Sequence, residues 1–208
     1  MVVSLDDVLA VETAEREATQ QYRAILRHAL AHFSRRGYAG TNVRAIAADA
    51  SLSAPMINYY FKTKQALHEA VVQIVMATLT DLVWKNFPRV ASYEVQARWL
   101  IDRHAEFARV YPQALGLILG LVYGPPEGRP AVDLRELYGQ TIRGEREIVE
   151  KAVEDGRLKL REDVTIDDAV RALEDAINRV TVRSWEAPGL ASHLAEDTLK
   201  VMLYGISK

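Results

Sequence analysis

The sequence predicts an all-α protein in which a small N-terminal helical module is followed by a larger helical bundle. Apolar residues recur at three- and four-residue spacing in almost every segment, and no convincing stretch alternates with a period of two. Two short helices are predicted near the start of the chain and longer ones afterwards. These patterns favour an N-terminal extension at residues 1–19, a module at residues 20–67 and a bundle at residues 68–208.

The module is predicted from its helix boundaries. Gly37 suits the C-terminus of a first helix, and Asn42 and Ser53 suit the N-caps of two short helices joined by a three-residue turn. Thr63 suits the N-cap of a longer helix, which Pro88 prevents from continuing. The predicted helices span about residues 17–36, 43–50, 54–60 and 64–86.

The bundle is predicted to add helices at about residues 93–111, 113–123, 132–154, 166–186 and 190–204. Residues 124–130 form a loop rich in Gly and Pro, and Pro188 and Gly189 separate the last two helices. Thr165 and Asp168 have the spacing of a capping box. The last two helices carry narrow apolar seams, which suit an interface with a second copy of the chain. Alternatively, these seams close the core of a single chain.

Composition excludes several classes of protein. The absence of cysteine excludes disulfide scaffolds, thiolate zinc sites and cysteine nucleophiles. The longest uninterrupted apolar run, at residues 114–123, is too short for a hydrocarbon core that needs roughly 20 residues, so no membrane partner is expected. Asp6 and Asp7 stand where a signal peptide would carry its basic start and apolar run, and a cytoplasmic location is the simplest expectation.

Charge is unevenly distributed along the chain, although the net charge is only −2. Residues 20–70 carry seven basic and two acidic side chains, a local charge of +5, which leaves −7 for the remainder. Such asymmetry suggests that one part of the chain meets a polyanion, whereas the alternative is a solvated basic helix face.

The strongest functional pattern is the succession of helix, Gly37 turn, short helix, three-residue turn and short helix within the basic segment. This is the layout of a helix-turn-helix, whose second short helix enters the major groove of DNA. An ordinary corner between helices is the structural alternative. The residues expected to contact DNA are Thr41, Asn42, Arg44, Ser53, Ala54, Pro55, Asn58, Tyr59, Tyr60, Lys62 and Lys64.

The same segment resembles the N-terminal signature of TetR-family transcriptional regulators over about 45 residues. The matching positions are Ile25, Leu26, Ala29, Phe33, Gly37, Tyr38, Thr41, Val43, Ile46, Ala47, Ala50, Ser53, Ile57, Tyr60, Phe61, Lys64 and Leu67. The resemblance implies a sequence-specific DNA-binding regulator, most often a repressor, that is released from a palindromic operator by a small-molecule effector. It also implies a homodimer formed through the helices at about 166–186 and 190–204, and no cofactor.

Three residues depart from the family pattern. Ser51 replaces a glycine that is usual in the turn, which serine tolerates at a small cost. His32 replaces a common leucine in the first helix, and Asn58 replaces a common tyrosine in the recognition helix. Asparagine can pair bidentately with adenine N6 and N7, although Asn58 could equally bind only phosphate or water.

We predict no catalytic residue and no metal site, and therefore not an enzyme. His28 and His32 have metal-ligand spacing, but no third ligand is near in sequence, and a hydrated or DNA-facing pair is expected. The di-iron carboxylate–histidine motif, the Gly-x-Ser-x-Gly elbow and the P-loop are all absent from the sequence. The alternative function is a helical small-molecule-binding protein or enzyme that does not bind DNA.

An effector pocket is expected among aromatic residues of the bundle, since small-molecule sites are mostly apolar. His104 is the one strongly polar group on its apolar stripe and is either a core histidine or a ligand contact. The aromatic residues, for their part, could simply form core. The residues expected to bind an effector are Trp84, His104, Phe107, Tyr111, Tyr123 and Tyr138.

Overall fold

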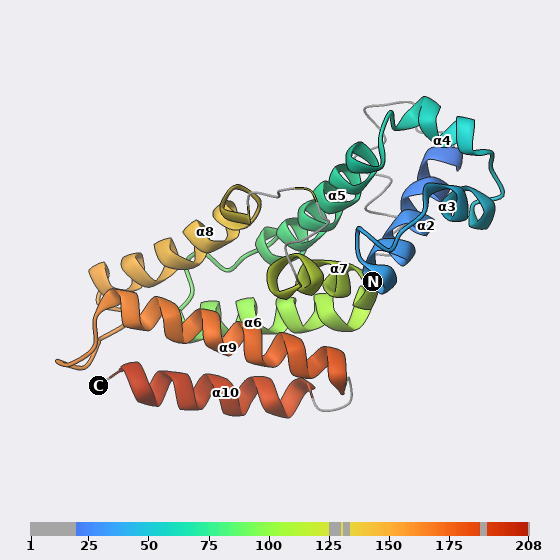
Figure 1. The fold of residues 1–208 in the computed structure, drawn as a ribbon. Helices are drawn as coiled ribbons and strands as arrows, with labels where there is room; N and C mark the ends of the chain where they lie inside the picture. The colour runs from blue at the N-terminus through green and yellow to red at the C-terminus, as the bar shows by residue number, and fades with distance from the viewer. Residues whose placement is uncertain (1–19, 125–129, 131–133, 188–190, 208) are drawn as a thin grey trace. The chain divides into compact units, whose positions relative to one another are not determined.

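The described part of the chain is entirely helical in a computed structural model. The structure describes residues 20–124, 130, 134–187 and 191–207, which form nine α-helices and no β-strand and confirm the predicted class (Figure 1). The helices are α2 (Gln20–Arg36), α3 (Val43–Asp49), α4 (Ala54–Tyr60), α5 (Lys64–Trp84), α6 (Tyr93–Val110), α7 (Pro112–Tyr123), α8 (Leu134–Glu154), α9 (Ile166–Glu186) and α10 (Ala191–Ile206).

Each helix lies within a few residues of its predicted range. Several predictions fall outside the described residues: the extension at 1–19, the first residues of the helix predicted at 17–36, most of the loop at 124–130, and the break at Pro188 and Gly189.

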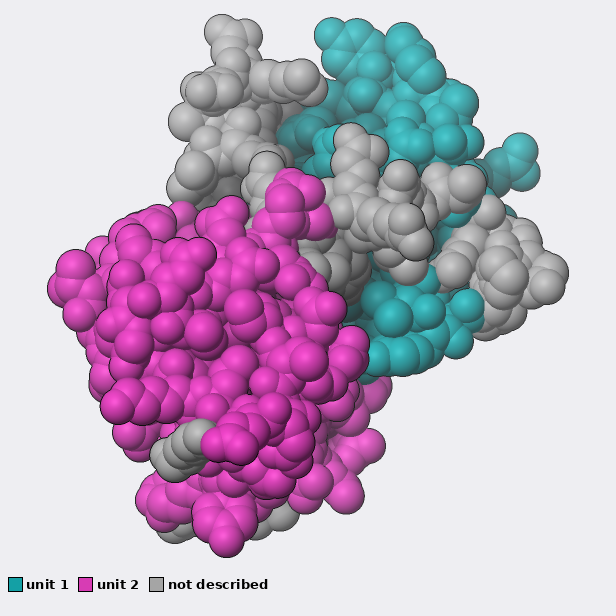
Figure 2. Space-filling model, turned by 90° about the vertical axis from the view of Figure 1, so that its left-hand side faces the viewer, with its two compact units in different colours: residues 1–78, 111–137 teal, residues 79–110, 138–208 magenta. Residues whose placement is uncertain are grey.

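The chain divides into two compact units, coloured separately in Figure 2. Unit 1 comprises residues 1–78 and 111–137, and unit 2 comprises residues 79–110 and 138–208. The chain passes from unit 1 to unit 2 within α5, which is one continuous helix. By length and composition α5 could cross a membrane, but 56% of its apolar window is buried within the protein, as in a core helix of a soluble protein.

Unit 1 is organised around α2. Ile25, Leu26, Ala29 and Phe33 form the buried stripe that the sequence predicts, and α7 packs against the same helix. The helix ends at Gly37, whose positive φ of 65° is a conformation that glycine adopts without a steric penalty. Its backbone N–H donates to the carbonyl of Phe33 at 3.0 Å, which closes the last turn of α2.

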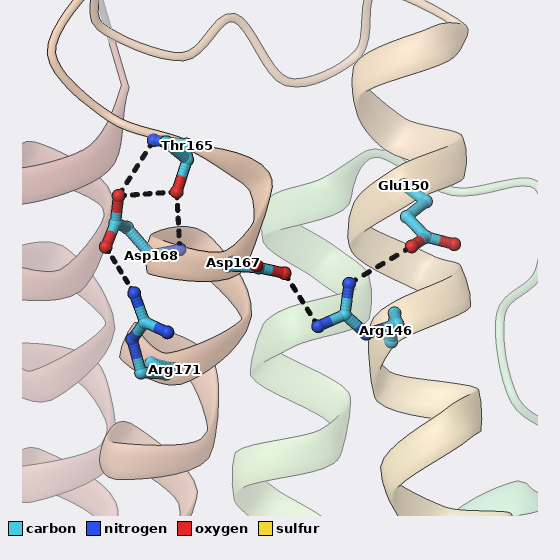
Figure 3. Close-up of polar contacts among 6 residues, drawn as sticks. All are labelled: Arg146, Glu150, Thr165, Asp167, Asp168 and Arg171. Carbon is cyan, nitrogen blue, oxygen red and sulfur yellow. Dashed lines mark hydrogen bonds and ion pairs between the residues drawn. The ribbon is translucent and has the colours of Figure 1, made fainter.

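Unit 2 is built on α6, α9 and α10, which pack against one another. The start of α9 is fixed by the predicted capping box, since the Thr165 hydroxyl accepts from the backbone N–H of Asp168 and the Asp168 carboxylate accepts from that of Thr165 (Figure 3). The Thr165 hydroxyl also donates to the Asp168 carboxylate, and this bond, with those from the Thr165 backbone N–H and the Arg171 guanidinium, lowers the pKa of Asp168 to about 2. Arg146 of α8 donates to Asp167 at 2.7 Å and so links α8 to the first turn of α9.

Candidate nucleic-acid interface

The two short helices of unit 1 have the predicted caps. The Asn42 side chain accepts from the backbone N–H of Arg44 at 2.9 Å and caps α3, and the Ser53 hydroxyl accepts from that of Met56 at 3.4 Å and caps α4. Between them, Ser51 has a left-handed φ of 56° and stands where the family usually has glycine. The turn is closed by the N–H of Leu52, which donates to the carbonyl of Ala47 at 2.8 Å.

Helix α4 leaves most of its surface to solvent. Ile57 is its buried side chain, and it anchors the helix to the rest of unit 1. Pro55 and Asn58 are exposed, and Tyr59 is 72% exposed. A seven-residue helix with capped N–H groups and an outward polar face can enter a groove of DNA without unfolding any part of the module.

A surface hollow beside α4 gathers most of the residues predicted to contact DNA. Seven of the predicted residues line the hollow: Thr41, Asn42, Arg44, Ala54, Pro55, Asn58 and Lys64. The hollow is also lined by Ala39, Gly40 and Val43. Sequence reasoning did not identify Ala39, Gly40 and Val43, because residues of this kind contribute backbone and shape rather than a recognisable charge.

The other four predicted residues do not line the hollow. Ser53 caps α4, and Tyr59 and Lys62 are exposed elsewhere on the module. The hydroxyl of Tyr60 donates to Oε1 of Gln21 at 3.3 Å, at the beginning of α2. Thr41 lines the hollow but is buried, and its hydroxyl donates to the carbonyl of Gly37 at 2.7 Å. Its side chain therefore holds the entrance to α3 in place.

Lys64 is held at the edge of the hollow. Its ammonium donates to the carbonyl of Ala39 at 3.4 Å and lies 4.4 Å from the centre of the Tyr38 ring. Partial burial lowers the pKa of Lys64. The Tyr38 ring stacks on Phe33 and meets the edge of His68, so the support beneath the ammonium is itself part of the packed core.

The expectation for His32 was wrong. Its side chain is only 7% exposed, and its Nε2 lies 2.7 Å from Oδ2 of Asp49, at the end of α3. A position that leucine commonly fills in the family is here occupied by a buried polar contact between two helices. The fold brings the two side chains together from 17 residues apart in the sequence, so that neither position alone indicates its partner. Within the described residues, no group of three His, Cys, Asp or Glu side chains could hold a metal ion.

The residues predicted to bind an effector are divided between the two units. His104 and Phe107 are buried in unit 2, and Trp84 packs there against Phe87. Tyr111 and Tyr123 belong to unit 1, where Tyr123 is 72% exposed. The side chain of Tyr138 lies outside the described residues.

Unit 2 contains a buried pair of titratable groups. His104 donates from Nδ1 to the carbonyl of Leu100 at 2.8 Å, and its Nε2 lies 4.0 Å from Oε1 of Glu145. Burial lowers the pKa of His104. Burial, with the nearby charge of Glu174, raises the pKa of Glu145 to about 8. Both groups are therefore neutral at pH 7, which is how a histidine and a carboxyl group can share a dry interior.

The capped, outward-facing α4, the tight turn before it and the basic hollow beside it define a helix-turn-helix DNA-binding protein. Residues 25–71 match the family model described as bacterial regulatory proteins, tetR family. The match covers the helix-turn-helix segment, which resembles the DNA-binding segment of that family, and the chain is a DNA-binding transcriptional regulator.

Solved structures of regulators share the fold along most of their length. A TetR family transcriptional regulator from Chloroflexus aurantiacus is 16% identical with a TM-score of 0.72, and the match covers 95% of this chain and 98% of that one. The TetR family regulator PfmR from Thermus thermophilus is 24% identical with a TM-score of 0.69, and the match covers 92% of this chain and 99% of that one. FadR from Bacillus subtilis, solved in complex with stearoyl-CoA, is 16% identical with a TM-score of 0.69, and the match covers 89% of this chain and 99% of that one. No curated relative matches this sequence.

Proposed function

We propose that this regulator is a cytoplasmic repressor that binds a palindromic operator as a homodimer and leaves it when a small-molecule effector binds. The observation that carries the proposal is the hollow beside α4, where the basic residues Arg44 and Lys64 flank the exposed Asn58. Cations on either side of a recognition helix hold DNA by its phosphates, and the side chain between them is placed to meet base edges. No catalytic role and no cofactor are proposed.

The dimer is proposed to form through α9 and α10. Trp185, Val201 and Tyr204 are large apolar side chains on these helices and are 41%, 73% and 87% exposed. Such exposure on neighbouring helices supports an interface with a second copy. A dimer would present two recognition helices about 34 Å apart, the spacing of successive major grooves on one face of DNA.

The effector is proposed to bind among residues 68–208, at the predicted positions Trp84, His104, Phe107, Tyr111, Tyr123 and Tyr138. Effector binding would favour a state in which α5 is tilted and the two recognition helices are mis-spaced. The continuity of α5 from unit 1 into unit 2 supports this route. Effector and DNA would then weaken each other's binding reciprocally, by typically ~1–3 kcal/mol. Recognition-helix spacing that is unchanged between dimer structures with and without effector would exclude the tilt.

Replacing Arg44 or Lys64 by alanine is expected to weaken operator binding about fivefold to tenfold, because each change removes a phosphate contact. A band-shift titration against DNA upstream of the chain's own gene measures the effect. The loss should be similar on unrelated DNA, and the slope of log affinity against log salt should fall by about one. Arg109, an exposed cation of α6 in unit 2, is the control, and its replacement by alanine should leave binding unchanged. Salt-independent binding, or full affinity in both variants, would exclude this interface.

Asn58→Ala is expected to relax specificity at one or two operator positions by about 1 kcal/mol, without changing the salt dependence. Affinities for a set of operators with single base changes measure this. A uniform loss of affinity across all of them would instead assign Asn58 to the phosphate backbone.

A further inference from the structure

His32 and Asp49 occupy positions that neither residue favours alone. His32 lies on the apolar stripe of α2, where burying an imidazole without a hydrogen bond is costly. Asp49 is the last residue of α3, where the negative end of the helix dipole disfavours a carboxylate. Their side chains meet at 2.7 Å, so that each compensates for the placement of the other. Two coupled departures from local preference point to a function rather than to packing alone.

The protonation of the pair follows from its geometry. A carboxylate oxygen can only accept, so Nε2 of His32 carries a proton and donates to Asp49, while Nδ1 is buried without a hydrogen-bond partner within the described residues. That ring donates to the Asp49 carboxylate, and the hydrogen bond lowers the pKa of Asp49. The contact is therefore a charge-assisted hydrogen bond, the stronger kind of side-chain link between helices.

Apolar packing restrains α3 and α4 only weakly. The buried side chains of α3 are Ile46 and Ala47, and α4 buries Ile57. The turn between the helices is itself tightly bonded, because the N–H groups of Ser51 and Leu52 both donate to carbonyls of α3. Helix α4 also packs against α3, so a tether at Asp49, five residues before α4 begins, acts on the recognition helix through the turn and this packing.

We propose that the hydrogen bond between His32 and Asp49 positions the recognition helix for DNA, with His32 and Asp49 acting as positioning residues that do not contact DNA themselves. The inference rests on the proposed DNA interface. Asp49 and Glu69 are the two acidic residues of the basic segment, and simple electrostatics predicts that removing either charge tightens DNA binding. The proposal predicts instead that removing Asp49 weakens DNA binding.

The test compares Asp49→Ala with the matched control Glu69→Gln in band-shift titrations, with the melting temperature of each variant followed by circular dichroism. The Glu69 carboxylate accepts from Gln65 within α5, away from the link between α2 and α3, so its removal should leave affinity unchanged or slightly higher. Asp49→Ala should weaken DNA binding about tenfold, which is the scale of one hydrogen bond to a charged group. The loss is expected even though alanine suits the C-terminus of a helix better than aspartate does.

Variants of His32 complete the test. His32→Leu fills the buried site but cannot donate, and should lose affinity as Asp49→Ala does, with no further loss in the double variant. His32→Gln keeps a donor near the position of Nε2 and should restore most of the affinity. Operator binding by Asp49→Ala or by His32→Leu as tight as that of Glu69→Gln would overturn the inference, even if the other variant fails to fold. A wild-type chain that binds no DNA would instead exclude the proposed function itself.

Discussion

Glu145→Gln is expected to become progressively more stable than the wild type as the pH rises from 5 to 8. The carboxyl group of Glu145 ionises near pH 4.5 in the unfolded chain but at about pH 8 in the folded one. Between these values the unfolded state releases a proton that the folded state retains, so the free energy of unfolding of the wild type falls as the pH rises. Glutamine resembles the protonated acid and does not titrate. The stability difference should grow by on the order of 3 kcal/mol over this range.

Denaturant titrations at several pH values measure this difference. Glu147→Gln is the control, because Glu147 is an exposed carboxylate on the same helix and its removal should give a difference that is constant with pH. His104 acts in the opposite direction: the lowered pKa of its folded form gives stability that is present above pH 6.5 and lost as the pH falls. Comparing each variant with the wild type at the same pH largely cancels this contribution. A pH-independent difference for Glu145→Gln would show that this group titrates alike in both states.

Gly144→Val is expected to lower the free energy of unfolding by about 3 kcal/mol, at the upper end of the range for overpacked positions. A Cβ atom at Gly144 would lie only 2.5 Å from Cη2 of the Trp84 ring, and closer still to Cζ2. The ring also packs against Phe87, so it cannot move without disturbing the end of α5. Chemical denaturation followed by far-ultraviolet circular dichroism measures the loss, and tryptophan fluorescence reports the displacement of the ring.

Gly120→Ala is the matched substitution with the opposite expected sign. A Cβ atom at Gly120 would meet no atom within 4 Å, so alanine should stabilise α7 by about 0.5–1 kcal/mol through helix propensity. A stable Gly144→Val variant with unchanged fluorescence would contradict the close contact between α8 and Trp84.

The helices were predictable because local signals determine them. Asn42, Ser53 and Thr165 precede helices that they cap in the structure, and Gly37 takes the left-handed conformation that ends α2. The capped and exposed helix α4 was predictable for the same reason, since a helix-turn-helix is encoded within about 20 consecutive residues. Charge and spacing in such a segment are visible without knowledge of its partners.

Contacts between distant residues were not predictable in the same way. The sequence indicates that His32 is unusual for its position but not that Asp49 accepts its hydrogen bond, because the register between α2 and α3 is set by packing of the whole module. The pairing of His104 with Glu145 and that of Trp84 with Gly144 each join residues from different helices of unit 2. Aromatic residues likewise repeat at helical spacing whether they form core or line a pocket, so periodicity alone does not separate these roles.

The support of Lys64 by Ala39 and Tyr38 has a thermodynamic consequence for association. A free lysine side chain loses roughly 1.5–2 kcal/mol of rotamer entropy when it is immobilised. In this chain part of that ordering occurs during folding, because the ammonium already rests on a carbonyl and an aromatic face. The proposed phosphate contact would therefore be made by a cation whose position is largely set, and its entropic penalty would be smaller than for a freely rotating lysine.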